Sequence, residues 1–161
     1  MLKTIAVMTS GGDSPGMNAA IRAVARTALY EGVAIWGINN GYKGLLEEDL
    51  FLMESRSVSD IIQRGGTFLG TARCPEVETP AGRRKCYENL MKRGIQGLVV
   101  IGGDGTMKAA LAISSEVQSR GLKISVIGIP KTIDNDINFI PQSFGFETAA
   151  FKATEAIECA H

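Results

Sequence analysis

Three short segments of this sequence combine glycines with acidic side chains, and these residues are the best suited to chemistry. The segments are SGGDSPG at 10–16, GGDGT at 102–106 and PKTIDND at 130–136. Glycines let a backbone approach a phosphate closely, so that its N–H groups can donate to the phosphate oxygens. Aspartates repel phosphate, and their presence beside these glycines therefore predicts a bound Mg²⁺, which prefers oxygen ligands. The pattern indicates a phosphate site of an uncommon kind, because the sequence contains neither GxxxxGK[ST] nor GxGxxG.

The segments that must position these residues alternate between short apolar runs and longer runs of helical period. Strands are predicted at 3–9, 33–38, 51–53, 97–101 and 124–129. Helices are predicted at 17–31, 57–63, 80–93, 106–120 and 147–160, the third with Thr79 as its N-cap and Pro80 at its first position. This rhythm predicts a three-layer α/β/α domain with a mostly parallel, Rossmann-like sheet. Right-handed crossovers would then bring the three loops to one edge of the sheet.

Composition narrows the class of protein. The 161 residues, 45% of them hydrophobic, are enough for one domain with a sizeable core. Basic and acidic residues balance at 17 each, so the net charge gives no reason to expect nucleic acid or a membrane as partner. Three distant cysteines without a CxxC motif are typical of a reduced, cytoplasmic protein. No apolar run has the length of a signal peptide core or a membrane span, and we therefore expect a cytoplasmic location.

Longer motifs around the three loops resemble the 6-phosphofructokinase family. They are GGDSPGMNAAIR at 11–22, RGGTFLGTAR at 64–73, VVIGGDGT at 99–106 and PKTIDNDI at 130–137. GGDGT alone is also typical of NAD kinases and diacylglycerol kinases, whereas TIDNDI together with GGDSPGMN is far more specific. The resemblance covers essentially the whole chain. It implies a glycolytic, Mg²⁺-dependent transfer of the terminal phosphoryl group of ATP to the 1-hydroxyl of fructose 6-phosphate.

The resemblance implies roles on the donor side of such a site. Gly12 would donate its backbone N–H to the phosphoryl group during transfer, and Arg73 would bridge the donor phosphates and neutralise charge. Cys74 would line the nucleotide site, although no base lies near it in sequence to make it a reactive thiol. The donor phosphates would be held by Gly103, Asp104, Gly105 and Thr106, with Asp104 as a ligand of Mg²⁺.

On the sugar side, the resemblance implies that Thr132 and Asp134 contact the 1-hydroxyl, with Asp134 as the base, and that Asp136 positions the metal and the base. An aspartate beside bound cations stays ionised and can accept a proton. Taken alone, Asp134 and Asp136 also suit a turn around Asn135. Asp13 could similarly be the cap of the helix that begins near residue 17.

Two positions bear on the phosphoryl donor, and they disagree. Gly105 leaves space for the α-phosphate of a nucleotide, where pyrophosphate-dependent relatives typically carry an aspartate. Lys131 resembles the pyrophosphate-dependent group, since common bacterial ATP-dependent members have glycine there. The steric argument at Gly105 is the more direct, and we predict ATP, with pyrophosphate as the alternative.

The resemblance also bears on regulation and assembly. Arg22 and Arg26 would share one helix face, where the family binds an allosteric nucleotide between subunits of a homo-oligomer, a dimer or a tetramer. The sequence departs from the bacterial pattern nearby, with Ser55 in place of an arginine and Arg56 one position later.

Family members are much longer than this chain. We therefore predict that residues 1–161 are the N-terminal donor-binding and catalytic domain, without the sugar-phosphate-binding half and inactive alone. A truncated, non-catalytic nucleotide-binding module is the alternative from another class. A NAD kinase-like enzyme is disfavoured, because TIDND follows GGDGT at the spacing of the sugar kinases.

Overall fold

A six-stranded sheet forms the centre of the molecule, with the strand order β3-β2-β1-β4-β5-β6. The computed structural model describes residues 2–138 and 140–160. The strands are β1 (Thr4–Ser10), β2 (Ala34–Ile38), β3 (Leu50–Leu52), β4 (Gly97–Gly102), β5 (Ser125–Thr132) and β6 (Phe144–Gly145). Only β3 pairs antiparallel, with β2, and the remaining pairs among the described strands are parallel. The order is Rossmann-like, with the reversal of winding between β1 and β4.

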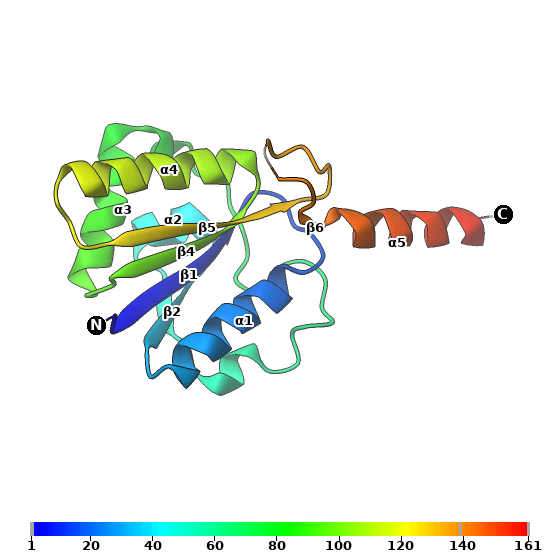
Figure 1. Cartoon of the computed structure of the whole chain (residues 1–161), viewed down its shortest axis with the longest axis horizontal. Coiled ribbons are helices and arrows are strands. Elements are labelled where there is room, and N and C mark those ends of the chain that lie inside the picture. Colours follow the sequence, from blue (N-terminus) through cyan, green and yellow to red (C-terminus); the bar gives the residue numbers. More distant parts are fainter. Residues whose placement is uncertain (1, 139, 161) are drawn as a thin grey trace.

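Helices cover both faces of this sheet, as Figure 1 shows. They are α1 (Met17–Tyr30), α2 (Gly41–Glu47), α3 (Pro80–Lys92), α4 (Asp104–Ser119) and α5 (Phe146–Cys159), with single 3₁₀ turns η1 (Ser55–Val58) and η2 (Pro75–Glu78). Along β1, Ala6 and Met8 pack with α2, α3 and α4, whereas Val7 packs with α1 on the other face. This alternation is what the pleat of a strand imposes. The predicted three-layer α/β/α class is confirmed.

The carboxyl ends of the three central strands lie in register. Ser10 is paired with Gly102, and Gly102 is paired with Pro130. The three glycine-rich and acidic loops therefore leave the sheet from one edge, as predicted. They begin beside the point where the winding reverses, which is where open α/β sheets bind ligands.

Most predicted boundaries differ from the observed ones by one or two residues, and two predicted elements differ by more. The helix predicted at 57–63 is instead the short turn η1, because Asp60 has a left-handed backbone with φ 55° that no α-helix accommodates. The strand predicted to end at residue 129 continues to Thr132, because Lys131 and Thr132 pair with β6. Part of the segment PKTIDND is thus strand, and the loop proper begins at Ile133.

Helix α2 has no counterpart in the sequence prediction. Its seven residues include Gly41 and Gly44, which disfavour helices. At Gly44 a Cβ atom would lie 1.7 Å from the carbonyl oxygen of Asn39, so the chain path there requires glycine. Tertiary packing therefore decides this helix, whose Tyr42 and Leu45 are buried in the core.

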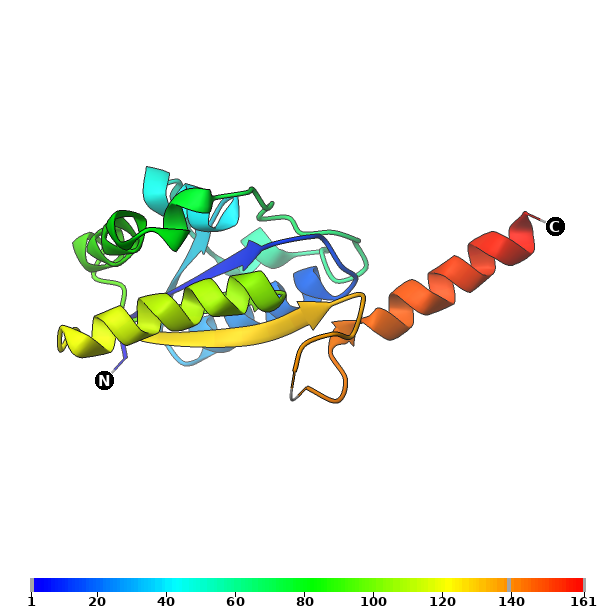
Figure 2. The same cartoon turned by 90° about the horizontal axis from the view of Figure 1, so that it is seen from above.

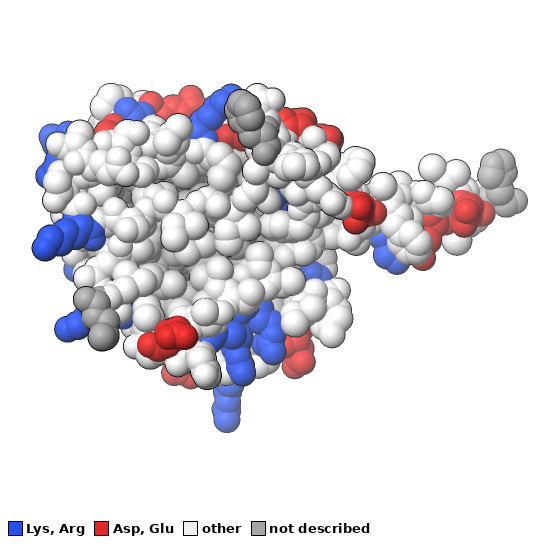
Figure 3. Space-filling model, viewed as in Figure 1, with Lys and Arg blue, Asp and Glu red and all other residues white. Residues whose placement is uncertain are grey.

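The C-terminal helix stands apart from the domain. Figures 1 and 2 show α5 projecting away from the sheet, and none of its described residues is buried. Figure 3 shows few charged side chains on the face over β5 between α4 and α1, where Ile127 is 58% exposed. Within the described residues, no helix is long and apolar enough to cross a membrane.

Candidate active site

A cavity of about 1050 Å³ opens at the carboxyl edge of the sheet. Its lining includes Gly12, Arg73, Cys74, the segment Gly103–Thr106 and Lys131, which are all the donor-side residues predicted from the sequence. They are supplied by the loops that follow β1 and β4, the first turn of α4, strand β5 and the loop before η2. Residues up to 119 positions apart in the chain are thus brought to one cavity, as the alternating pattern predicted.

The first loop is held close to the third by Lys131. The Lys131 side chain is buried, and its Nζ donates to the carbonyl oxygen of Gly12 over 2.6 Å. Burial lowers the pKa of Lys131, and the carboxylates of Asp13, Asp134 and Asp136 oppose that change. The Asp13 carboxylate does not cap α1, whose N-cap is Gly16 without a side-chain hydrogen bond.

The second loop becomes the first turn of α4. Gly103 is the N-cap of this helix and Asp104 its first residue, so the free N–H groups and the positive helix end face the cavity. Tyr42 of α2 holds this loop in place, because its hydroxyl donates to the carbonyl oxygen of Thr106 over 2.9 Å. Burial raises the pKa of Tyr42, which keeps this phenol a hydrogen-bond donor.

The Asp104 carboxylate suits a Mg²⁺ ion that binds together with the phosphates of a phosphoryl donor. It is exposed in the cavity and pairs with Lys108 Nζ over 2.7 Å. The described residues contain no group of three or more acidic, histidine or cysteine side chains that could cage an ion. Protein-bound Mg²⁺ commonly takes only one or two carboxylates, with phosphates and water completing its shell. A single accessible aspartate at the N-terminus of α4 therefore fits the predicted metal.

The third loop is a tight turn built on its side chains. Thr132 Oγ1 donates to Asp136 Oδ1 over 2.9 Å and accepts from the N–H of Asp134 over 3.0 Å. Asn135 takes the left-handed conformation with φ 51°, and its Oδ1 accepts from the N–H of Ser143. Asn135 and Thr132 are thus the turn-forming residues, and the Asp134 side chain stays exposed. The cavity lining does not include Thr132, Asp134 and Asp136. These residues follow Lys131, which does line the cavity.

The rear wall of the cavity was not predicted from the sequence. It consists of residues of α2, η2, α3 and α4, namely Tyr42, Val77, Glu78, Arg83, Lys108, Ala109 and Ala112. Lys108 follows Asp104 by four residues, one turn of the observed α4, but the predicted helix began only at residue 106 and did not include Asp104. The others are brought together by the packing of α3 against α4, to which sequence spacing gives no guide.

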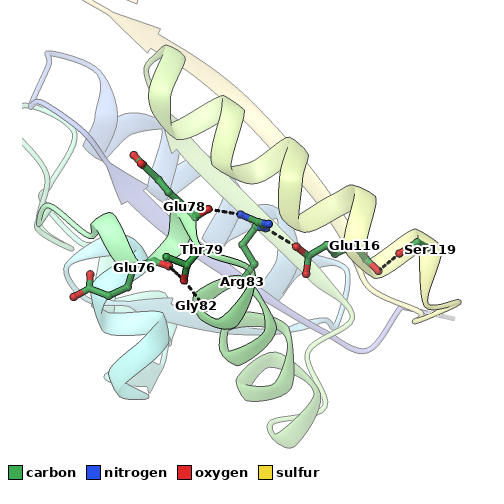
Figure 4. A network of polar contacts seen from close by, with 7 residues as sticks. All are labelled: Glu76, Glu78, Thr79, Gly82, Arg83, Glu116 and Ser119. Atoms are coloured by element: carbon green, nitrogen blue, oxygen red, sulfur yellow. Dashed lines mark hydrogen bonds and ion pairs between the residues drawn. The ribbon is translucent and has the colours of Figure 1, made fainter.

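Arg83 joins α3 to α4 at this wall, as Figure 4 shows. Its Nε donates to Glu116 Oε1 over 2.5 Å, and its Nη1 donates to the carbonyl oxygen of Glu78 over 2.6 Å. Thr79 accepts from the N–H of Gly82 over 3.0 Å and is the predicted N-cap of α3. Hydrogen bonds and an ion pair therefore connect the two helices and the turn at this wall.

The cysteine predicted at the site is not a poised nucleophile. Burial raises the pKa of the Cys74 thiol, and burial raises that of the neighbouring Cys86 to about 12. Both groups stay protonated near neutral pH, which leaves Cys74 a lining residue.

The two predicted effector arginines lie away from the cavity, on α1. Arg22 Nη1 donates to the carbonyl oxygen of Val58 over 2.6 Å, and Arg26 Nη1 donates to Ser55 Oγ. Neither lines the cavity. In this chain both side chains connect α1 to η1, and Ser55 is a partner of one of them.

A cavity lined by glycines and a helix N-terminus, at the winding reversal of a Rossmann-like sheet, is typical of α/β domains that bind phosphates. Comparison with known proteins gives the family of this domain. The Phosphofructokinase family model matches residues 4–161, and the chain belongs to that family.

Its relatives include "ATP-dependent 6-phosphofructokinase" of Staphylococcus epidermidis, 54% identical over 98% of this chain and 48% of the relative. The protein of the same name from Staphylococcus aureus is 57% identical over 92% of this chain and 45% of the relative. The chain thus spans about half the length of the curated relatives it matches.

Solved structures agree. The phosphofructokinase of Saccharomyces cerevisiae superposes with a TM-score of 0.87 at 37% identity, covering 98% of this chain and 24% of that one. A pyrophosphate-dependent phosphofructokinase from Marinobacter aquaeolei superposes with a TM-score of 0.86 at 25% identity, covering 98% and 41%. The fold therefore occurs with both kinds of donor, and the donor must be argued from the cavity.

Proposed function

We propose that this chain is the donor-binding and catalytic domain of an ATP-dependent 6-phosphofructokinase. The reaction transfers the terminal phosphoryl group of ATP to the 1-hydroxyl of fructose 6-phosphate. The observation that carries the choice of ATP is the extent of the cavity beyond Gly105. A Cβ atom at Gly105 would meet nothing within 4 Å. The cavity then continues along α4 to Ala112, about two helical turns further.

The wall of this extension suits a nucleoside. Pro75, Val77, Ala109 and Ala112 present apolar surface, while Glu78 and Arg83 supply polar groups at its rim. Drug-sized and cofactor-sized ligands occupy cavities of roughly 300–1,000 Å³, so pyrophosphate would leave most of this space empty. Staphylococcal relatives at 54% and 57% identity are named as ATP-dependent, which supports the same choice.

Each site residue has a task in this proposal. The N–H groups of Gly12 and of the first turn of α4 bind phosphate oxygens, and Arg73 neutralises charge as the phosphoryl group moves. Asp104 holds Mg²⁺, which screens the charge of the donor phosphates when bound. Lys131 fixes the Gly12 loop and adds a positive charge near the donor. Asp134 accepts the proton of the 1-hydroxyl, and the Thr132–Asp136 hydrogen bond maintains the turn that presents it.

The domain assignment is part of the proposal. The residues that bind the 6-phosphate of the sugar are supplied by a further C-terminal region or by a second subunit. The projecting α5 and the weakly charged face over β5 are the surfaces that such a partner would cover. Arg22 and Arg26 would bind an allosteric anion only by exchanging their contacts with η1. Such a glycolytic enzyme would act in the cytoplasm as a homo-oligomer.

The test is a steady-state comparison of ATP and pyrophosphate with fructose 6-phosphate and Mg²⁺. It should use this chain alone and the protein expressed from the full reading frame that contains it. We expect turnover with ATP in the longer protein and none in the 161-residue chain. Turnover with pyrophosphate and none with ATP would overturn the donor assignment and make Lys131 the better guide.

A further inference from the structure

One face of α1 is bonded to the segment that leads to Arg73. Asn18, Arg22 and Arg26 recur at intervals of four residues, which places them in one row along the helix. Arg26 bonds to Ser55, Arg22 to Val58, and Asn18 to the loop after η1. The proposed function gives a role to Arg73 at the end of this segment but none to Asn18.

The Asn18 amide binds the loop with both of its ends. Its side chain is only 2% exposed. Nδ2 donates to the carbonyl oxygen of Arg64 over 3.0 Å, and Oδ1 accepts from the N–H of Phe68 over 2.8 Å. A carboxylate could accept but not donate, and an aliphatic side chain could do neither. Asparagine is therefore matched to two points of the loop that lie four residues apart.

Strand β1 holds the same loop at a second place. Thr9 is fully buried, and its hydroxyl donates to the carbonyl oxygen of Gly70 over 3.0 Å. Because that hydrogen is used, the Thr67 hydroxyl must be the donor in its 2.8 Å contact with Thr9. The loop is thus attached to the two elements, β1 and α1, that flank the Gly12 loop. Gly70 is three residues before Arg73.

We propose that Asn18 is a positioning residue: it holds the loop at 64–70, and through that loop it places Arg73 over the donor cavity. The part concerning the reaction rests on the proposed function. Asn18 does not line the cavity, and it acts only through the loop. Loss of the amide should let the loop and Arg73 sample other positions. A displacement of about 1 Å at a charge-neutralising group can cost on the order of 10²-fold in rate.

The first measurement is hydrogen exchange of residues 64–73 in this chain for Asn18→Ala and Asn18→Asp. The matched control is Asn89→Ala, because Asn89 is a buried amide that donates to the carbonyl oxygens of Leu45 and Leu46, at α2. We expect exchange in the loop to rise about tenfold for both Asn18 variants and to stay unchanged for the control. Asn18→Asp retains the acceptor for Phe68, so it serves if Asn18→Ala does not fold.

The second measurement is steady-state kinetics of the two Asn18 variants in the protein from the full reading frame. We expect kcat to fall about 10- to 100-fold with KM for the donor changed less than about threefold. In an Arg73→Ala background, Asn18→Ala should lower kcat by less than about twofold more, because its effect passes through Arg73. If Asn18 had only a structural role, Asn18→Ala would lower the yield of folded protein, and its effect on kcat would be the same with and without Arg73→Ala.

The outcomes test the positioning role of Asn18 separately from the proposed function. Unchanged exchange at 64–73 would overturn the positioning role, whatever the enzyme does. Faster exchange with wild-type kcat would overturn it as well. If the unmutated protein from the full reading frame transfers no phosphoryl group from either donor, the proposed function fails. The exchange comparison would then still decide whether Asn18 holds the loop.

Discussion

At the scale of single residues, the backbone of Asp134 is held in place by a hydrogen bond, whereas its side chain is free to contact a substrate. Its N–H is bound to Thr132 Oγ1, and its carboxylate is exposed. Asp134→Asn keeps the size of the side chain and this backbone bond but removes the base. We expect kcat with fructose 6-phosphate to fall about 10²- to 10⁴-fold, with little change in KM or in the melting temperature.

A matched control for this substitution is available at Asp60. It is exposed and, with φ 55°, occupies a conformation that asparagine accepts as readily as aspartate. Asp60→Asn should leave kcat unchanged. Near wild-type kcat in Asp134→Asn would reduce Asp134 to a turn residue and remove the base from the mechanism.

Gly105 allows a test of the donor without disturbing the fold. A side chain there meets nothing within 4 Å, and an acidic residue is favourable in the first turn of a helix. In Gly105→Asp the new carboxylate would repel the α-phosphate by about 4 kcal/mol at 4 Å and an effective dielectric near 20. We expect kcat/KM for ATP to fall by at least about 100-fold, and any use of pyrophosphate to fall much less.

The control for this experiment is Gly105→Ala, which adds a Cβ without a charge. Because the space beside Gly105 is open, we expect kinetics with ATP close to those of the unmutated protein. Equal losses for alanine and aspartate would show that bulk, and not charge, limits the donor.

At the scale of elements, the start of α3 is stabilised by Thr79. Its hydroxyl accepts from the N–H of Gly82 and donates to the carbonyl oxygen of Glu76 over 2.7 Å. Thr79→Ala removes both bonds and should lower the free energy of unfolding by about 1 kcal/mol, measured by urea denaturation. Thr27→Ala, at an exposed position inside α1, should not lower it. An unchanged stability in Thr79→Ala would mean that Pro80 alone sets the helix start.

At the scale of the whole molecule, α1 and α5 form a natural comparison, since each has 14 residues. Helix α1 has five buried residues, whereas α5 has none in its described length. Isolated helices shorter than about 12–15 residues are marginal in water, so α5 lacks the packing that would stabilise it. We expect amides of α5 in this chain to exchange near the rate of an unfolded peptide and those of α1 to be strongly protected.

The same measurement bears on the proposed domain organisation. In the protein from the full reading frame, the α5 amides should become protected because a partner region covers them. Strong protection of α5 already in the 161-residue chain would indicate self-association of this chain and would call for its oligomeric state to be measured.

Much of the fold and of the donor side of the site was determined by the sequence alone. Alternation of apolar runs with helical periods is a local property, and it correctly predicted α/β/α layers and a mostly parallel sheet. Because parallel strands place their following loops at one edge, the same alternation also predicted that the glycines and Asp104 lie together. Local chemistry also sufficed for the Thr79 cap, which depends only on residues within one turn of helix.

The rest was decided by tertiary structure, because it depends on which distant surfaces meet. Helix α2 forms although its glycines disfavour a helix, because Tyr42 and Leu45 are buried in the core. Strand β5 extends to Thr132 because β6 pairs with it. The rear wall of the cavity depends on how α3 packs against α4, and the bonds of Asn18 span 46 and 50 positions of sequence. Side-chain contacts between residues so far apart have no periodicity to reveal them, and only the folded chain defines which amide meets which loop.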